Sequence, residues 1–205
     1  MASFETQVNG LTGLGATLSS STTPTDTELD QFLKDGVLDV TRRTIEVRPQ
    51  DTYKFIKESS EKTSNTSSPL DLNGAKIISV VRESGTNDDW RECRLITPSM
   101  QSRVTDTDSL DFASSFNPAY SILDNGQINV FPAPSAGGSN SFKVYYVNNL
   151  PQDKGGNTLD HTHSDIKYFA DDRVYLVVIY AAIKCLEAKM AEYTIDEEDS
   201  ELVQT

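Results

Sequence analysis

The sequence predicts an α+β fold in which helices from both ends of the chain form a helical core, with an inserted, sandwich-like antiparallel β module and extended arms. An apolar run from Val174 to Ile183 lies in a helix-like segment over 165–190. Residues 25–45 carry apolar side chains at steps of three and four, which is the spacing of a second long helix. Residues 70–147, between these segments, contain β-branched runs and turn signals that are typical of short strands.

Residues 1–23 are rich in Gly, Ser and Thr, and we expect them to form a flexible N-terminal arm. A helical region over 24–66 follows. Thr25 and Glu28 have the spacing of a capping box, which marks a helix start. Gly36 costs a helix roughly 1 kcal/mol relative to Ala, and a glycine there permits the close approach of a neighbouring backbone. The apolar stripe of this helix consists of Leu29, Phe32, Leu33, Val37 and Val40.

The β module is expected over 67–150, after a short helix that starts at Pro49 and a polar linker over 59–68. Asn125-Gly126 favours the positive φ of a type I′ turn and predicts a hairpin over 120–131. Further strands are expected over 75–81, 91–96 and 142–147, with a helical turn over 98–104.

The C-terminal region over 151–191 is expected to end in a helix that packs on 24–66. This helix is apolar on nearly every side and must therefore be covered on nearly every side. The sequence predicts only one other long helix, which cannot cover all of this apolar surface. This indicates an assembly component and not an enzyme. The apolar run is too short for a bilayer, which requires roughly 20 residues. The acidic stretch 192–205 is expected to be a solvated tail, because like charges repel a compact state.

The net charge of −13 repels nucleic acid and anionic membranes as static partners. The same charge suits a passage through which nucleic acid slides without sticking. Cys93 and Cys185 are far apart in the sequence and are expected to be free thiols in a reducing compartment. Because residues 1–16 lack a basic start and a long apolar run, we expect a soluble protein made inside the cell.

His161 and His163, with Asp160 and Asp165 beside them, form the one stretch that resembles a metal-ligand cluster. They lie in a polar linker without a third histidine, so exposed residues near the final helix are favoured over a metal site. Asp165 is then expected to be a favourable charge at the helix N-terminus. The sequence contains no nucleophile elbow and no phosphate-binding loop. We therefore expect no enzyme, with no catalytic, cofactor-binding or metal-binding residues.

Two further features have alternative interpretations. Trp90, the single tryptophan, is a candidate partner contact, although the favoured interpretation is that its side chain packs at the edge of a sheet. Arg42, Arg43 and Arg48 fall at the end of the first long helix, where basic residues are favourable. The alternative for these arginines is a set of salt bridges to the acidic surface of a neighbouring subunit.

Four strings resemble a family of structural proteins from marine, cyanophage-like tailed bacteriophages, in the same order across 25–190. These strings are Asp35–Val40, Glu92–Met100, Phe116–Tyr120 and Tyr175–Leu186. Proteins of this kind are similar to head-to-tail connector adaptors, which form a ring of about twelve copies beneath the portal at the capsid vertex.

The resemblance implies a virion protein at the head–tail junction, made in the host cytoplasm, that extends the DNA channel and supports genome ejection. Its implied partners are other copies of the chain, the portal protein and a tail or neck protein. Double-stranded DNA would pass through without specific binding, and no membrane or cofactor is implied. The candidate packing residues, within and between subunits, are Leu29, Phe32, Leu33, Val37, Val40, Tyr175, Val178, Ile179 and Ile183.

Two other functions remain open at this stage. The first is a β-sandwich binding module of a tail or neck protein that recognises a glycan or receptor, suggested by Trp90, Tyr120, Tyr145 and Tyr146. The second is a hydrolase, suggested only by the abundant carboxylates, of which the sequence singles out no pair. Loss of self-association in Leu33→Asp would favour the ring subunit, whereas loss of glycan binding in Trp90→Ala would favour the binding module.

Overall fold

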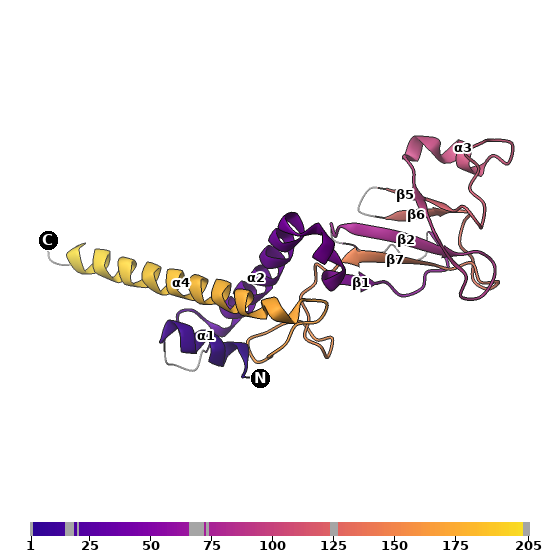
Figure 1. Cartoon of the computed structure of the whole chain (residues 1–205). Helices are drawn as coiled ribbons and strands as arrows, with labels where there is room; N and C mark the ends of the chain where they lie inside the picture. Colours follow the sequence, from indigo (N-terminus) through magenta and orange to yellow (C-terminus); the bar gives the residue numbers. More distant parts are fainter. Residues whose placement is uncertain are drawn as a thin grey trace. The chain divides into compact units, whose positions relative to one another are not determined.

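The computed structural model confirms the α+β class, with helices at both ends of the chain and mostly antiparallel sheets between them (Figure 1). The chain divides into two compact units. The helical unit comprises Met1–Phe55 and Leu150–Thr205, and the β unit comprises Ile56–Asn149. The structure describes residues 2–14, 19, 21–65, 72, 74–123 and 127–202.

The described part of the helical unit contains five helical segments. They are α1 (Phe4–Thr12), α2 (Asp26–Val47), the 3₁₀ helix η1 (Pro49–Phe55), the 3₁₀ turn η4 (Asp171–Arg173) and α4 (Val174–Leu202). Both α1 and α2 pack against α4 (Figure 1). The core of this unit therefore includes a third helix, which the sequence patterns did not predict.

Helix α1 replaces part of the expected flexible arm. Ser3 caps its start by accepting a hydrogen bond from the N–H of Thr6 at 3.3 Å, and Gly13 ends it in the left-handed conformation with φ of 67°. Phe4 and Val8, one helical turn apart, are fully buried. The segment is ordered because both ends are capped and this apolar pair has a surface to pack on.

Helix α2 begins as predicted, with both halves of the capping box formed. Thr25 Oγ1 accepts from the N–H of Glu28 at 3.2 Å, and Glu28 Oε2 accepts from the N–H of Thr25 at 2.8 Å. At Gly36 the close neighbours are side chains of α4 of the same chain, and not a neighbouring backbone as expected. A Cβ atom at this position would lie 3.1 Å from Tyr180 Cδ1 and 3.3 Å from Val177 Cγ1.

Helix α4 differs from the expected segment at both ends. It begins at Val174, after η4, and continues to Leu202 through the stretch expected to be a solvated tail. No Gly or Pro interrupts the sequence from Val174 to Leu202, and Lys189 pairs with Glu192 on the adjacent turn. Among the helices that the structure describes, none is both long and apolar enough to cross a membrane.

The β unit contains two sheets. The four-stranded sheet has the order β1 (Ile56–Glu58), β7 (Phe142–Val147), β2 (Ile77–Glu83) and β3 (Trp90–Glu92). The three-stranded sheet has the order β4 (Arg94–Leu95), β5 (Ala119–Ile122) and β6 (Ile128–Phe131). All neighbouring strands are antiparallel except β4 and β5, which are parallel.

Several predicted elements of the β module are present, with some changes. The expected strand over 91–96 is interrupted at Cys93, so that β3 and β4 belong to different sheets. The expected helical turn consists of η2 (Pro98–Met100) and α3 (Gln101–Thr105). Strands β5 and β6 pair as the predicted hairpin, whereas its expected Asn125-Gly126 turn lies outside the described residues. The unit starts before the expected boundary at 67, because β1 pairs with β7.

Both sheets contribute side chains to one apolar core. Its buried members are Leu72, Val80, Cys93, Tyr120, Ile128, Val130, Phe142, Val144 and Tyr146. A smaller cluster beside α3 is formed by Ile96, Val104, Ala113, Ala119 and Phe131. The two sheets thus share a core in the manner of a small sandwich.

The two cysteines are free and buried. Burial raises the pKa of the Cys93 thiol to about 12 and that of the Cys185 thiol to about 11. Because the thiolate is the reactive form, we expect neither cysteine of the folded protein to react with a chromogenic disulfide reagent at pH 8. Both should react once the protein is unfolded in guanidinium chloride, and rapid labelling of the native protein would contradict this expectation.

Candidate inter-subunit surface

Helix α4 has a buried apolar face and an exposed apolar face. The buried face is formed by Val177, Val178, Ala181, Ala182 and Cys185, none of which is more than 5% exposed. Helices α1 and α2 supply the surfaces that pack against α4. Within one chain, these two helices therefore cover only one apolar face of α4 and leave the other exposed.

The exposed face consists of six large side chains that recur every three or four residues. Because this spacing follows the helical repeat, they form one continuous stripe, called here the α4 stripe. At ~1.5 Å per residue, the stripe is about 27 Å long. Its members are 40% to 68% exposed: Tyr175, Ile179, Ile183, Leu186, Met190 and Tyr193.

A groove of about 620 Å³ lies between α2 and α4. Tyr175, Ile179 and Ile183 of the α4 stripe line it on one side, and Val40 and Val47 of α2 line it on the other. Val47 is 79% exposed, so the groove has uncovered apolar surface on both helices. Its volume is in the range typical of binding sites, roughly 300–1,000 Å³.

Arginines lie beside the groove on the α2 side. Asp39 pairs with Arg43 at 2.7 Å and with Arg42 at 3.2 Å, and both arginine side chains are more than 70% exposed. Arg48 also lines the groove and is exposed, and no ion pair joins it to another described residue. The groove is thus lined by Arg43 and Arg48 together with Asp39 and Asp172, and Arg42 lies beside it. The two exposed pairs add little to stability, which leaves these arginines available to a partner.

Arg173 anchors the start of α4 at the end of the groove. Its guanidinium donates to Asp51 Oδ2 at 2.8 Å and to Thr44 Oγ1 at 2.6 Å. Both members of the Arg173–Asp51 pair are only 16% exposed, so the pair is shielded from solvent. It holds η1, α2 and η4, the turn that precedes α4, together and thereby shapes the groove.

The structure separates the candidate packing residues into two groups. Leu29, Leu33, Val37, Val40 and Val178 are buried within the chain, and Phe32 is half-buried. Tyr175, Ile179 and Ile183 are exposed and belong to the α4 stripe. Four further exposed residues of this surface were not predicted from the sequence: Val47, Leu186, Met190 and Tyr193. Continuing the three- and four-residue spacing beyond Ile183 would have predicted the last three.

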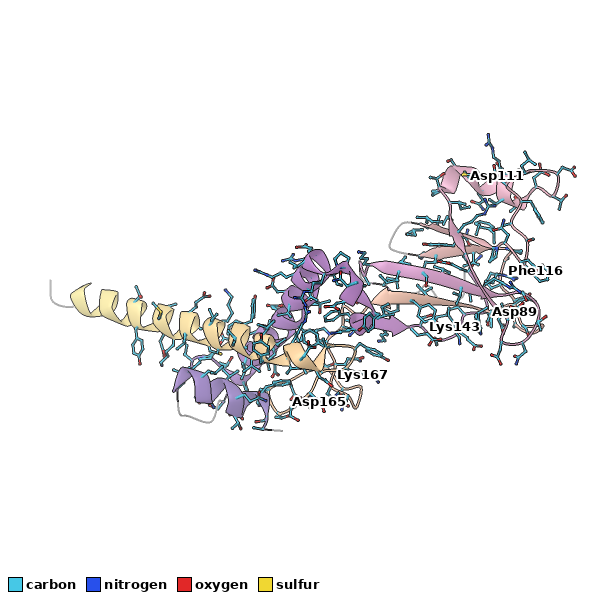
Figure 2. All side chains as sticks on the ribbon, viewed as in Figure 1. Asp89, Asp111, Phe116, Lys143, Asp165 and Lys167 are labelled. Atoms are coloured by element: carbon cyan, nitrogen blue, oxygen red, sulfur yellow. The ribbon has the colours of Figure 1, made fainter. Side chains whose placement is uncertain are left out.

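Trp90, the candidate partner contact of the β unit, lies on the edge strand β3 and is half-buried. The ammonium group of Lys143 (Figure 2) lies 4.3 Å from the centroid of its ring. Glu58 and Glu61 hold that ammonium at 3.1 Å and 3.4 Å. One face of the indole is therefore covered by a cation–π contact.

The other aromatic residues that suggested a glycan-binding module are also withdrawn from solvent. Tyr120 and Tyr146 are buried at 8% exposure, and Tyr145 is half-buried. With Trp90 they offer no exposed aromatic platform on which a sugar ring would stack.

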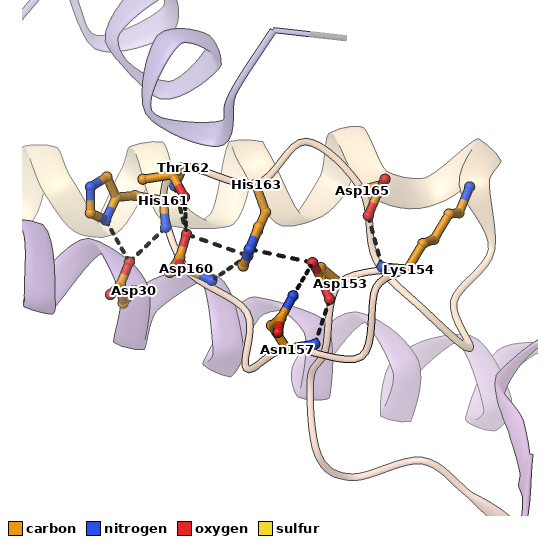
Figure 3. A network of polar contacts seen from close by, with 9 residues as sticks. All are labelled: Asp30, Asp153, Lys154, Asn157, Asp160, His161, Thr162, His163 and Asp165. Carbon is orange, nitrogen blue, oxygen red and sulfur yellow. Dashed lines mark hydrogen bonds and ion pairs between the residues drawn. The ribbon is translucent and has the colours of Figure 1, made fainter.

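The two histidines organise the loop that precedes α4 (Figure 3). His161 Nδ1 lies 2.8 Å from Asp30 Oδ1, which also accepts the backbone N–H of His161 at 2.6 Å. His163 lies between two carboxylates, with Nε2 3.4 Å from Asp153 and Nδ1 3.3 Å from Asp160. The carbonyl oxygens of His163 and His161 accept the first backbone N–H groups of α1, at 2.7 Å and 3.0 Å. The loop therefore ties α1 to α2.

This geometry corrects the expectation for Asp165. The carboxylate accepts the backbone N–H of Lys154 at 2.9 Å (Figure 3), within the loop. Asp171 and Asp172, in the turn before α4, are the acidic residues nearest to the helix start. Over the described part of the chain, no group of three or more His, Cys, Asp or Glu side chains could hold a metal ion.

The histidine loop should make the helical unit sensitive to acid. Hydrogen bonds, first from the Asn157 side chain, together with the charge of nearby His163, hold the pKa of Asp153 below its ordinary value of 3.8. A lowered pKa stabilises the fold above pH 3.8, and this contribution is lost as the pH falls through the folded-state pKa.

Asp153→Asn is therefore expected to lower the thermal midpoint at pH 7, with the difference from wild type shrinking below pH 3.8. Circular dichroism at 222 nm from pH 7 to about pH 2.5 measures this convergence. Asp108→Asn, at an exposed turn of the β unit, is the control and should leave the midpoint unchanged. A difference for Asp153→Asn that is constant with pH would contradict the assignment.

Comparison with known proteins does not identify this surface. The chain matches no known protein family and no curated protein.

Proposed function

We propose that this chain is the structural subunit of a homo-oligomeric ring, of the head-to-tail connector class, in the virion of a tailed bacteriophage. The observation that carries the proposal is the α4 stripe, an apolar surface about 27 Å long on one side of a helix. Covering apolar surface contributes roughly 25 cal/mol per Å². Large contiguous apolar patches on a protein surface mark interaction sites.

In the proposed ring, the helical unit forms the contacts between subunits. The β unit is available to a tail or neck protein, and the portal protein contacts the ring from the capsid side. The net charge of −13 suits a channel through which DNA passes without binding, because an acidic wall repels phosphates. A lumen lined mainly by Lys and Arg would count against this assignment.

The oligomeric state of the purified protein tests the proposal. Mass photometry and negative-stain microscopy are expected to show closed rings of about twelve copies. Ile183→Asp, which places a charge at a 50% exposed position of the α4 stripe, should abolish the rings and leave the subunit folded. Leu110→Asp is the matched control, because Leu110 is fully exposed on the β unit.

Monomers at all concentrations up to about 100 μM would contradict the proposal, because a stable interface of ordinary size associates well below this concentration. Leu33→Asp is not a useful test. Leu33 is completely buried, and a charge at this position would unfold the helical unit before it could report on assembly.

A further inference from the structure

We propose that the distal half of α4 from one copy occupies the groove between α2 and α4 of a second copy. The distal half is the segment from Leu186 to Leu202. This inference rests on the proposed self-assembly and identifies the two surfaces that meet. Helix α4 would then contribute to both sides of the contact. Its proximal half lines the groove of its own chain together with α2, and its distal half occupies the groove of a neighbouring copy.

The distal half has the apolar side chains that such a groove requires. Leu186, Met190 and Tyr193 are 40%, 68% and 60% exposed and lie on the same side of the helix. The last turns of α4 extend beyond the other helices of the unit (Figure 1). The groove offers Val47, Ile179 and Ile183 as apolar partners. Helix-in-groove contacts use anchors at this spacing.

The distal half cannot fill the groove of its own chain. Ile183 is the groove residue of α4 nearest to the distal half, and Tyr193 lies ten residues beyond it on the same uninterrupted helix. At ~1.5 Å per residue, these two residues are about 15 Å apart, and a straight helix cannot fold back on itself. Contact between Tyr193 and the groove therefore requires a second copy.

Charge complementarity also favours this occupant. Beyond Lys189, the sequence of α4 contains no basic residue, and its C-terminal end carries the negative pole of the helix dipole. Arg43 and Arg48 at the groove would meet that negative charge. Opposite charges steer two copies into register and resist the wrong orientation. The acidic residues of this segment are Glu192, Asp196, Glu197, Glu198, Asp199 and Glu201.

Two assemblies satisfy the same contact. Repeating it head to tail gives a ring, because two different surfaces of each subunit meet. Two copies with antiparallel α4 helices instead form a closed dimer, in which each distal half meets the groove of its partner. The contact and the ring are therefore separable by experiment.

Crosslinking between two single-cysteine variants tests the contact. Val47→Cys, at the groove, is prepared unlabelled, and Tyr193→Cys, on the distal half, is prepared with ¹⁵N. After mixing, a bismaleimide with a reach of about two helical turns is added. The two native cysteines are buried, so the introduced thiols should react first.

The expected product is a crosslinked dimer in which one unlabelled peptide is joined to one ¹⁵N peptide. Val47→Cys alone and Tyr193→Cys alone should give much less dimer. An oligomeric mixture with no link between positions 47 and 193 would overturn the proposal. Mainly homodimeric products would also overturn it.

Charge reversal provides an independent measurement. Arg43→Glu combined with Arg48→Glu is expected to weaken self-association about tenfold or more in analytical ultracentrifugation. Adding Glu197→Lys and Glu198→Lys should restore it. Arg103→Glu, at an exposed position of the β unit, is the control and should have no effect. Unchanged self-association of the double variant would overturn the proposal.

These results separate the contact from the ring. The expected crosslink in particles that are only dimers would support the contact and contradict the connector ring. Closed rings that lack the crosslink would support the ring and overturn the contact. Monomers in every condition would contradict both.

Discussion

Gly36→Val is expected to destabilise the helical unit by about 2 to 3 kcal/mol. A Cβ atom at this position would lie 3.1 Å from the Tyr180 ring and 3.3 Å from the Val177 side chain, which is already tight contact. The two methyl groups of valine would then push α2 away from α4. Overpacking of this kind typically costs 1–3 kcal/mol, and the branched side chain adds a smaller penalty within a helix.

Two spectroscopic probes can locate this effect. Circular dichroism at 222 nm reports mainly on the helical unit, whereas Trp90 is the single tryptophan and reports on the β unit. In urea, the midpoint from circular dichroism should fall and the midpoint from fluorescence should stay in place. Gly10→Val is the matched control, since Gly10 is also helical and a Cβ atom there meets nothing within 4 Å. Equal losses in the two variants would show that helix propensity, and not the close approach, is responsible.

Arg82→Leu is expected to destabilise the β unit by about 3 kcal/mol. Arg82 is 3% exposed, and its guanidinium donates to Pro132 O at 2.9 Å, to Asn140 Oδ1 at 3.3 Å and to Glu83 O. These bonds attach the loop between β6 and β7 to strand β2. Leucine has no donors, so one buried and two partly buried oxygens would lose a hydrogen-bond partner, and such a loss at a buried group typically costs 1–3 kcal/mol.

The fluorescence of Trp90 measures this change directly. Its midpoint in urea should fall for Arg82→Leu, while the circular dichroism of the helical unit changes little. Arg91→Leu is the matched control: Arg91 is opposite Arg82 in the β2–β3 pairing, but its side chain is 45% exposed. An equal shift for both substitutions would mean that the buried hydrogen bonds contribute no more than a surface arginine.

The elements that could be predicted are those whose signals are local. The start of α2 is encoded in four residues, Thr25 to Glu28, because the cap and the first turn satisfy each other. Strand β7 is a continuous β-branched and aromatic run, and its observed bounds equal the predicted 142–147. The break at Cys93 could not be predicted, because whether a strand changes sheets depends on partners distant in the sequence.

Helix α1 was missed for a related reason. Its composition, with Gly and Thr among nine residues, is that of a flexible segment, and only Phe4 and Val8 are buried. Such a short helix is marginal in isolation. It is stable here because it packs on α4 and because the loop of His161 and His163 accepts its first N–H groups.

For the candidate site, periodicity alone established that α4 carries more apolar surface than one other long helix can cover. It could not establish which side would remain exposed, since that depends on where α1 and α2 pack. The folded chain buries the Val177 side and leaves the α4 stripe beside the groove. A helix repeats every 3.6 residues whatever surrounds it, whereas the burial of each face is a property of its neighbours. The sequence therefore determines that α4 has more apolar surface than its own chain covers, whereas tertiary packing determines which face of the helix stays exposed.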